Sequence, residues 1–343
     1  MKTIAFFNNK GGVGKTTLVY HVAWTLSDMG LNVLVADLDP QANLSSMFLP
    51  EERLDELWPN GPHPDSMLGA VAPILRGMGD IARPHVEEIA DGFGLLVGDL
   101  GLSRFEDKLS QEWPRCSDGQ EDAFRAITSF HRILGQAAEA RSADVVLIDV
   151  GPNLGAINRV ALLAAQHVVV PLAPDLFSLQ GLRNLGPTLR DWRGQWSRRK
   201  DLAPPGLSIP GGDMTPAGYV VLQHNVRLDR PVKAYAAWAQ RIPEEYRTSV
   251  LGKPIEASVS TEDDTHCLAL LKQYRSLMPM AMEARKPIFH LRPADGARGA
   301  HVAAARRCGE DFERLTRAIA SRVDLDLQAQ GPSMNPHATE TTR

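Results

Sequence analysis

The sequence contains few cysteines and no long apolar run. Its three cysteines, Cys116, Cys267 and Cys308, lie far apart and form no Cys-x-x-Cys pair. This spacing argues against a disulfide scaffold, a zinc ribbon or a cysteine-ligated iron–sulfur cluster on this chain. No stretch approaches the roughly 18 apolar residues of a membrane-spanning helix, and no signal peptide opens the chain, so the sequence predicts a cytoplasmic protein.

An excess of basic charge is also absent. The 343 residues include 37 Lys and Arg against 41 Asp and Glu, which gives a net charge of −4. A generally basic protein of the histone kind is therefore excluded, although a local basic face is compatible with this total. Hydrophobic residues make up 43% of the chain, enough for a packed core.

Short apolar runs alternate with amphipathic stretches over most of the chain. The runs lie at residues 4–7, 32–37, 95–97, 144–149, 167–172 and 219–222, and the helical patterns at 15–30, 123–141, 153–165 and 179–193. Such runs are typical of strands buried on both faces of a parallel sheet. The sequence predicts an α/β fold with a doubly wound, mostly parallel sheet flanked by helices. We expect one domain over residues 1–323 and a disordered polar tail over 324–343.

A phosphate-binding loop is indicated by residues 10–17, which read Lys-Gly-Gly-Val-Gly-Lys-Thr-Thr. The general motif G-x-x-x-x-G-K-[ST] is met at its end, but Asn9 stands where its first glycine belongs. The glycines let the backbone turn successive N–H groups toward one anion, and the following helix adds its positive end. The expected phosphate-binding residues are Gly11, Gly12, Val13, Gly14, Lys15, Thr16 and Thr17, with Lys15 on the β- and γ-phosphates, Thr16 on Mg²⁺ and Thr17 on the α-phosphate.

Lys10 is an additional cation at the start of this loop. It lies too close to the first helical turn to fold back easily onto the same phosphates. From there it is able to reach the nucleotide of a neighbouring subunit, and a solvated loop lysine is an equally good interpretation of its position.

These features resemble the ParA/MinD/Soj family of deviant Walker A P-loop ATPases, and within it the ParA-type partition ATPases. Residues 37–43, Asp-Leu-Asp-Pro-Gln-Ala-Asn, resemble the D-x-D-P-Q-x-N switch segment of ParA proteins, and Asp149 ends a strand as the family's Walker B aspartate does. The likeness covers about residues 1–320, through Gly155, Pro171, Gly181 and the Lys-Pro-Ile-Phe segment at 286–289. Its most specific part lies in residues 10–43.

The resemblance implies an ATPase that works with ATP and Mg²⁺ as a homodimer. In this family the lysine that matches Lys10 crosses the dimer interface and contacts the other subunit's phosphates, so that ATP is enclosed between the two subunits of a sandwich dimer. By the same resemblance Lys10, Lys15 and Asp39 are catalytic, with Asp39 orienting or activating the attacking water. Thr16, Asp37 and Asp149 are the expected metal site, with Asp149 acting through a water. If the strand continues to Asp39, both switch aspartates project to one face.

Two parts of the expected site are less well defined. The family usually has Asp-Thr-Pro-Pro at its Walker B end, whereas this chain has Asp-Val-Gly-Pro at residues 149–152, a change that bears on the flexibility of the second switch and on the hydrolysis rate. Gln223 and Asn225 follow the strand at 219–222, where family members carry a polar residue on adenine. Either amide suits that role, and a polar strand end explains both equally well.

A basic cluster occupies residues 181–200. Its members are Arg183, Arg190, Arg193, Arg198, Arg199 and Lys200, opposed by a single acid, Asp191. The usual meaning of such a run is a solvated helix face, and the alternative is a phosphate-binding patch. Because ParA dimers bind DNA without sequence preference through surface basic residues, the resemblance favours DNA binding. Arg227, Arg230 and Lys233 form a second, smaller candidate group.

Together these features favour a ParA-like ATPase that drives segregation or positioning of plasmid, chromosome or protein cargo. Non-specific DNA and a ParB-like or cargo-adaptor protein are its expected partners, and its expected location is the nucleoid-associated cytoplasm. The alternative is a metabolic P-loop enzyme of the amidoligase or cobyrinate synthase type, against which Lys10 and the switch segment argue. No membrane partner is expected, because the C-terminal residues lack the apolar face of an amphipathic helix.

Overall fold

The computed structural model describes residues 1–223, 226–227, 230–231, 237–254, 259–272, 274 and 276–327. Within them a sheet of eight strands runs in the order β10-β7-β6-β1-β5-β2-β4-β3. The strands are β1 (Lys2–Phe6), β2 (Val33–Asp37), β3 (Glu87–Ala90), β4 (Phe93–Leu96), β5 (Val145–Asp149), β6 (His167–Leu172), β7 (Thr215–Gln223) and β10 (Cys267–Lys272). All neighbours are parallel except β3 and β4. The predicted α/β fold with a mostly parallel sheet is confirmed.

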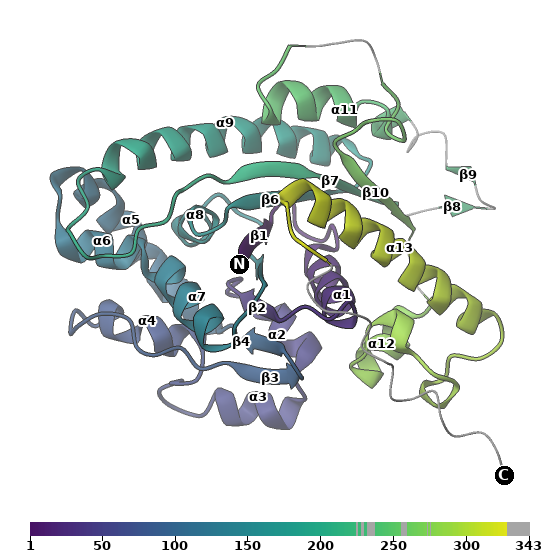
Figure 1. Ribbon diagram of the computed structural model, residues 1–343, viewed down its shortest axis with the longest axis horizontal. Coiled ribbons are helices and arrows are strands. Elements are labelled where there is room, and N and C mark those ends of the chain that lie inside the picture. The colour runs from purple at the N-terminus through teal and green to yellow at the C-terminus, as the bar shows by residue number, and fades with distance from the viewer. Residues whose placement is uncertain are drawn as a thin grey trace.

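Helices cover both faces of this sheet (Figure 1). One face packs against α4 (Met67–Leu75), α5 (Phe105–Arg115), α6 (Glu121–Ile127), α7 (Ser129–Ala140), α8 (Ala156–Leu163) and α9 (Leu176–Lys200). The other packs against α1 (Lys15–Asp28), α2 (Asn43–Phe48), α3 (Glu51–Leu57), α12 (Met278–Ala284) and α13 (Ala300–Val323). Because alternate strand residues point to opposite faces, Ala5 and Phe7 join the first core while Ile4 and Phe6 join the second.

Shorter elements complete the described chain. They are the 3₁₀ turns η1 (Leu100–Arg104), η2 (Cys116–Asp118), η4 (Ile288–His290) and η5 (Pro293–Asp295), the π-helical turn η3 (Tyr246–Val250), the helix α11 (Ile242–Glu245) and a small ladder of β8 (Val226–Arg227) with β9 (Arg230–Pro231). The turn η3 packs directly on α9, because Gly186 leaves space for it: a Cβ there would lie 1.8 Å from the carbonyl oxygen of Ser249.

The structure corrects several expected boundaries. The pattern at 123–141 is two helices, α6 and α7, which meet at Thr128. Helix α9 begins at Leu176 and extends to Lys200 despite Pro187, so it is longer than the predicted 179–193. Strand β2 ends at Asp37, and Asp39 therefore lies in the loop after the strand rather than on it.

The sequence patterns placed the C-terminal third in the same domain but did not predict its strand β10 (Cys267–Lys272) or its helix α13 (Ala300–Val323). Strand β10 joins the sheet as an edge strand, and α13 presents Phe312, Leu315, Ile319 and Val323 to the core. These four residues recur at three- and four-residue spacing, which is the sequence signal that predicts this helix. No helix in the described ranges combines the length and the apolar character needed to cross a membrane. Most of the expected tail, residues 328–343, lies outside the described residues.

Candidate nucleotide-binding site

The glycine-rich loop lies between the end of β1 and the start of α1, at the carboxyl edge of the sheet (Figure 1). Gly12 and Gly14 have φ values of 73° and 86°, in the left-handed region that favours glycine. Gly14 precedes α1 without a side-chain cap, and the first turn of α1 carries no acidic residue. The backbone N–H groups of this first turn and the positive end of the helix dipole are therefore available to bind an anion such as a phosphate.

Lys15, Thr16 and Asp149 are brought together although more than 130 residues separate the loop from β5. The Lys15 Nζ donates to Asp149 Oδ1 at 2.7 Å, and the Thr16 hydroxyl donates to Asp149 Oδ2 at 2.8 Å. Strands β1 and β5 are neighbours in register Phe6 to Asp149, which explains the contact. All three predicted residues thus meet at one point at the C-terminal edge of the sheet.

Asp37 lies beside Asp149, because β2 and β5 pair in register at these two residues. One Asp37 oxygen accepts from the backbone N–H and the hydroxyl of Ser45, both at 2.8 Å. Its other oxygen, Oδ1, is buried without a hydrogen-bond partner. Burial, and then the charge of Asp149, raise the pKa of Asp37 to about 7. The carboxylates of Asp37 and Asp149 and the Thr16 hydroxyl form a donor set that suits Mg²⁺, and the orphaned Asp37 Oδ1 is free to bind it.

Asp39 is buried in the loop that follows β2, and its Oδ1 accepts from the Gln41 N–H at 3.0 Å. The Gly151 backbone packs on this carboxylate: a Cβ at residue 151 would lie 3.3 Å from Asp39 Oδ1. This gives a physical account of the unusual Walker B end, since a proline at 151 would crowd the Asp39 carboxylate. The two predicted switches therefore touch each other.

Two residues that the sequence reasoning missed hold the loop after Asp149. The buried Asn158 side chain accepts from the Gly151 N–H at 3.1 Å and donates to the Gly151 carbonyl at 2.8 Å and to the Asn153 carbonyl at 2.7 Å. The Glu106 carboxylate accepts from the N–H groups of Ala156 and Ile157, the first two residues of α8. The sequence does carry a signal for the Asn158 contacts, because an asparagine stands out among the apolar residues of this helix. Nothing in the local sequence indicates that Glu106 caps α8.

Lys10 is engaged within its own chain. Its Nζ forms an ion pair with Asp175, and lies 5.8 Å from the ring centroid of Phe177. Asp175 also caps α9, because its side chain accepts from the Ser178 N–H at 2.8 Å. Burial by itself raises the pKa of Asp175, but the hydrogen bonds from Lys10 and Ser178 and the charge of Lys10 together outweigh it, so the net pKa is lowered. Asp175 was not among the predicted site residues.

A cavity of about 150 Å³ adjoins the loop on the α1 side. It is lined mainly by apolar side chains, with Leu222, Ile288 and Phe312 among them, together with Gly14 and Thr17 of the loop and first helical turn, and such a cavity suits a planar base. The backbone of Gln223 ends β7 beside it. The Gln223 side chain and Asn225, the two expected adenine contacts, lie outside the described residues.

His21 lines the same cavity and joins α1 to the 286–289 segment. Its Nδ1 lies 2.8 Å from the Thr17 carbonyl oxygen, and its Nε2 accepts from the Ile288 N–H at 3.2 Å. Burial lowers the pKa of His21 to about 4. A neutral ring satisfies both contacts, with Nδ1 protonated and Nε2 as acceptor.

The basic cluster lies along α9, but much of it is already paired. Arg183 binds Glu245, Arg190 donates to the Ser249 and Val250 carbonyls, and Arg199 donates to the Trp113 and Gln195 carbonyls. Arg193 is half-buried, with a long contact to the Leu189 carbonyl. Arg198 and Lys200 are exposed at the end of the helix. The side chains of Arg227 and Arg230, and all of Lys233, lie outside the described residues.

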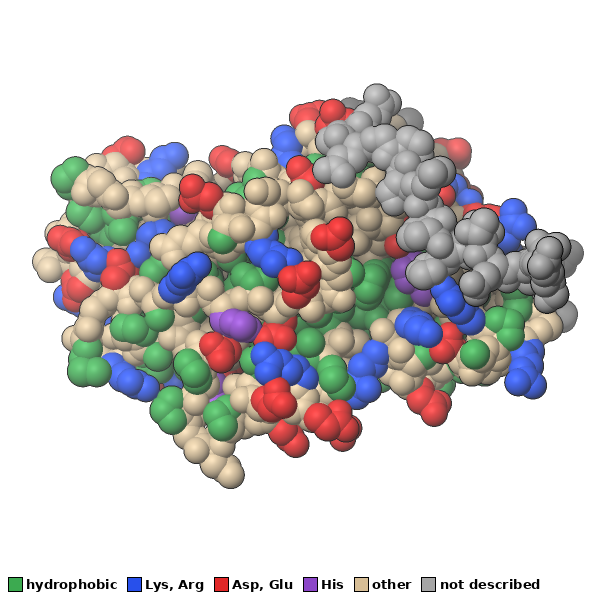
Figure 2. Space-filling model, turned by 60° about the horizontal axis from the view of Figure 1, so that its bottom comes forward, with side chains coloured by type: hydrophobic (Ala, Val, Ile, Leu, Met, Phe, Trp, Pro, Cys, Tyr) green, Lys and Arg blue, Asp and Glu red, His purple; other side chains and the backbone are tan. Residues whose placement is uncertain are grey.

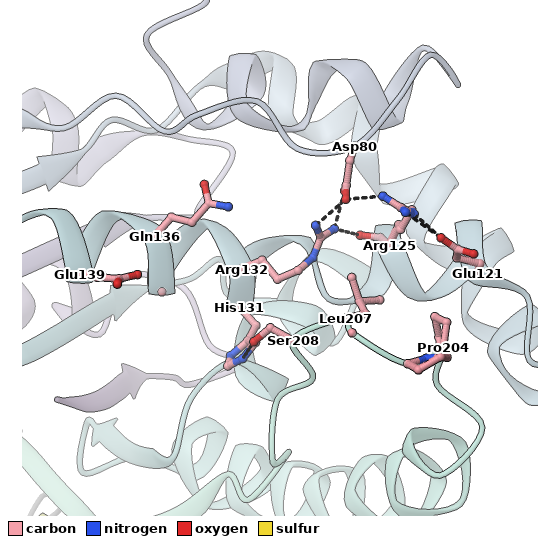
Figure 3. Close-up of a pocket in the computed structure, with 13 residues that line it drawn as sticks. Asp80, Glu121, Arg125, His131, Arg132, Gln136, Glu139, Pro204, Leu207 and Ser208 are labelled. Atoms are coloured by element: carbon pink, nitrogen blue, oxygen red, sulfur yellow. Dashed lines mark hydrogen bonds and ion pairs between the residues drawn. The ribbon is translucent and has the colours of Figure 1, made fainter.

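Charge elsewhere is mixed in sign. Figure 2 shows acidic and basic side chains interspersed over the face it displays. A separate hollow of about 640 Å³ lies between α6, α7 and residues 204–208 (Figure 3). Its arginines are paired within the hollow, since Asp80 binds both Arg125 and Arg132 and Glu121 also binds Arg125. None of the predicted site residues lines this hollow.

Comparisons with known proteins show what this chain is similar to. A family model described as an AAA domain matches residues 1–202. The chain is 28% identical over 255 residues to the chromosome partitioning protein ParA of Caulobacter vibrioides, covering 74% of this chain and 86% of that one. It is 31% identical over 193 residues to the IncC protein of Escherichia coli, covering 56% and 47%. The alignment with an uncharacterised Methanocaldococcus jannaschii protein, 30% identical over 195 residues, covers 56% of this chain and 66% of that protein.

Solved structures share the fold over nearly the whole chain. A Corynebacterium diphtheriae protein superimposes with a TM-score of 0.66 at 24% identity, covering 94% of this chain and 99% of that one. An ATP complex of a McdA variant from Cyanothece gives a TM-score of 0.63 at 15% identity, covering 96% and 99%. With the family model matching well over half of its residues and a deviant Walker A loop in place, this chain belongs to the ParA/MinD family of P-loop ATPases.

Proposed function

We propose that this protein is a ParA-like partition ATPase that binds Mg–ATP at the β1–α1 loop and hydrolyses it. The observation that carries the proposal is the meeting of Lys15, Thr16 and Asp149 beside the free N-terminus of α1. Lys15 and the loop N–H groups would hold the phosphates, and Thr16, Asp37 and Asp149 would hold the metal ion. Bound Mg²⁺ supplies charge neutralisation on the phosphate oxygens.

Asp39 is the proposed group that orients or activates the attacking water. It is a buried carboxylate beside the metal-site aspartates, and its contacts with Gln41 and Gly151 fix its position. A group placed in this way acts on the transition state, whereas ground-state binding depends on the loop amides and Lys15.

The active form in this proposal is a sandwich homodimer in which Lys10 reaches the partner subunit's nucleotide. Two facing nucleotides bring like charges together, and cations from both subunits offset the repulsion. Lys10 lies at the rim of the loop, partly exposed, and the ion pair with Asp175 holds its ammonium group on its own chain. A dimer of this kind would release Lys10 from Asp175.

Non-specific DNA is the proposed surface on which the dimer acts, and the end of α9 is the proposed contact. Support comes from the exposed pair Arg198 and Lys200 at the last turn of α9. Arg193 and Arg199 lie beside them on the same helix, while Arg183 and Arg190 are committed to contacts with 245–250. The proposed result is segregation or positioning of a plasmid, chromosome or protein cargo, with an adaptor protein stimulating hydrolysis.

The test combines dimerisation, hydrolysis and DNA binding in the full chain. We expect light scattering to show a dimer with Mg²⁺ and a slowly hydrolysed ATP analogue, and duplex DNA to bind that dimer. Changing Arg198 and Lys200 to Glu should weaken DNA binding and flatten its salt dependence by about 0.9 in log–log slope for each lost phosphate contact. The matched control is Arg183→Gln, which alters a paired residue of the same helix.

Two results would contradict the proposal. A chain that stays monomeric with the analogue is not a sandwich ATPase. Hydrolysis that rises with small carboxylate substrates and not with duplex DNA would point to a metabolic P-loop enzyme instead.

A further inference from the structure

Two apolar side chains are exposed at the rim of the nucleotide site. Phe177 is 70% exposed and Leu176 is 50% exposed, and among the described residues they are the only exposed large hydrophobics adjacent in sequence. Single exposed apolar residues are common on protein surfaces and need no explanation. A neighbouring pair that includes a phenylalanine is a candidate contact surface, because aromatic anchors are enriched at the centres of interfaces.

The position of this pair decides which partner it fits. Leu176 and Phe177 open helix α9 directly after Asp175, the residue that holds Lys10, and the Lys10 Nζ lies 5.8 Å from the Phe177 ring centroid. A surface that comes close to Lys10 therefore also comes close to Phe177. In the proposed sandwich that surface belongs to a second copy of this chain.

The start of the helix that carries the pair is also tied to the phosphate-binding loop. Ser178 ties the start of α9 to the end of β6, because its hydroxyl accepts from the Ala173 N–H at 3.1 Å and its N–H donates to Asp175 at 2.8 Å. Gly181 packs on the loop so closely that a Cβ there would lie 2.7 Å from Asn9 Oδ1. Because this backbone is already fixed, forming a contact there costs little backbone entropy.

We propose that Leu176 and Phe177 form an apolar contact between two copies of this chain in the nucleotide-bound dimer. This inference rests on the proposed function and adds a surface to it. A two-fold interface repeats the contact, so each dimer would bury two such pairs. Their burial excludes water beside Lys10 and the phosphates, which strengthens the charge interactions that close the sandwich.

The experiment compares Phe177→Ser with the wild type in light scattering or sedimentation, with Mg²⁺ and a slowly hydrolysed ATP analogue over a range of protein concentrations. We expect the dimer dissociation constant to rise at least about tenfold in Phe177→Ser, since the apolar area is lost twice per dimer. Phe177→Met, which keeps most of that area, should stay within about threefold of the wild type. Leu202→Ser removes an apolar side chain that is 49% exposed beyond the other end of α9, and it should leave the dissociation constant unchanged.

The outcomes separate this inference from the proposed function. A wild-type dimer together with an unchanged dissociation constant in Phe177→Ser would overturn the inference and leave the sandwich ATPase standing. Loss of fluorescent nucleotide binding by monomeric Phe177→Ser would also overturn it, because the side chain would then belong to the nucleotide site itself. A wild-type chain that never dimerises would contradict the proposed function, and this contact with it.

Discussion

Lys10 and Asp175 form an ion pair at the rim of the phosphate-binding loop, although 165 positions separate them in the sequence. Asp175 ends the connection from β6 to α9, and β6 is the direct neighbour of β1, so the fold places it next to Lys10. Both side chains are about one-third exposed, which limits the stabilisation to about 1 kcal/mol or less. The pair is strong enough to hold Lys10 on its own chain and weak enough to be exchanged for phosphate.

The first prediction concerns the release of Lys10. Asp175→Asn removes the charge but keeps a good N-cap for α9, so the helix start should remain intact. We expect the ATP-dependent dimer of this variant to form about two- to fivefold more readily, the size of a partly exposed ion pair. Sedimentation with the ATP analogue measures the dissociation constant. A weaker dimer in Asp175→Asn would show that the ion pair does not compete with dimerisation.

The second prediction is the converse change, Lys10→Ala. Lys15, Thr16 and the loop amides remain, so nucleotide affinity of the monomer should change less than about threefold. The variant should stay monomeric with ATP, hydrolyse it slowly and bind DNA weakly, because both cross-subunit cations are lost from a symmetric dimer. Light scattering with the analogue checks the first of these effects. Dimerisation equal to wild type would return Lys10 to the role of a surface lysine.

The third prediction tests the contact between the two switches. Asp39→Ala should keep nucleotide and metal binding but slow turnover at least about tenfold, since water positioning acts on the transition state. Gly151→Ala should also slow turnover, because the added methyl lies about as close to Asp39 as such contacts become. Steady-state hydrolysis and nucleotide titration measure the two effects separately. Wild-type turnover in Asp39→Ala would remove this residue from catalysis.

The fourth prediction concerns the start of α8. Glu106→Ala leaves the N–H groups of Ala156 and Ile157 without their acceptor and should cost about 1–2 kcal/mol of unfolding free energy. Glu106→Gln keeps one acceptor oxygen and should cost less. Amide exchange at residues 156 and 157 should become faster in Glu106→Ala. Equal stability of the alanine and glutamine variants would contradict this role.

The fifth prediction is a pH dependence of stability. The pKa of His21 falls from its ordinary value near 6.5 to about 4 in the folded chain, through burial. Between these pH values the unfolded chain binds a proton that the folded chain does not, so stability falls as the pH is lowered from 6.5 toward 4. His21→Gln keeps a donor and an acceptor but cannot bind a proton. It should therefore reduce this loss by up to about 1.4 kcal/mol per pH unit.

Urea unfolding at several pH values between 7.5 and 4 measures that difference. His131, His167 and His266 also have lowered pKa values through burial and contribute a slope of the same sign that remains in the variant, whereas Asp37, with its pKa raised to about 7, contributes a slope of the opposite sign in both proteins. An identical slope in wild type and His21→Gln would show that His21 is protonated in both the folded and the unfolded chain.

Local sequence determined the phosphate-binding loop and most of the sheet. The patterns of a buried strand, a glycine-rich turn and an amphipathic helix each lie within a short stretch of sequence. For this reason β1, the loop and α1 were predictable, and so were β2, β5 and β6. The same holds for Lys15 and Thr16, because their positions relative to the loop follow from the helix that begins there. Short-range spacing fixes these features because backbone geometry alone relates the residues involved.

Only the tertiary structure decided which distant groups complete the site. The resemblance already placed Asp37 and Asp149 in one metal site, and the structure supplies the reason they meet, which is the register of β2 with β5. Lys10 meets Asp175 because β6 lies beside β1, a contact that the sequence did not predict. Glu106 reaches α8 from a different helix, and Gly151 touches Asp39 across two loops. Strand order and register set these contacts, and both depend on how the whole core packs and not on any local pattern. The sequence by itself thus specified the loop that can bind phosphate, while the packed sheet specified the carboxylates and the partner residues around it.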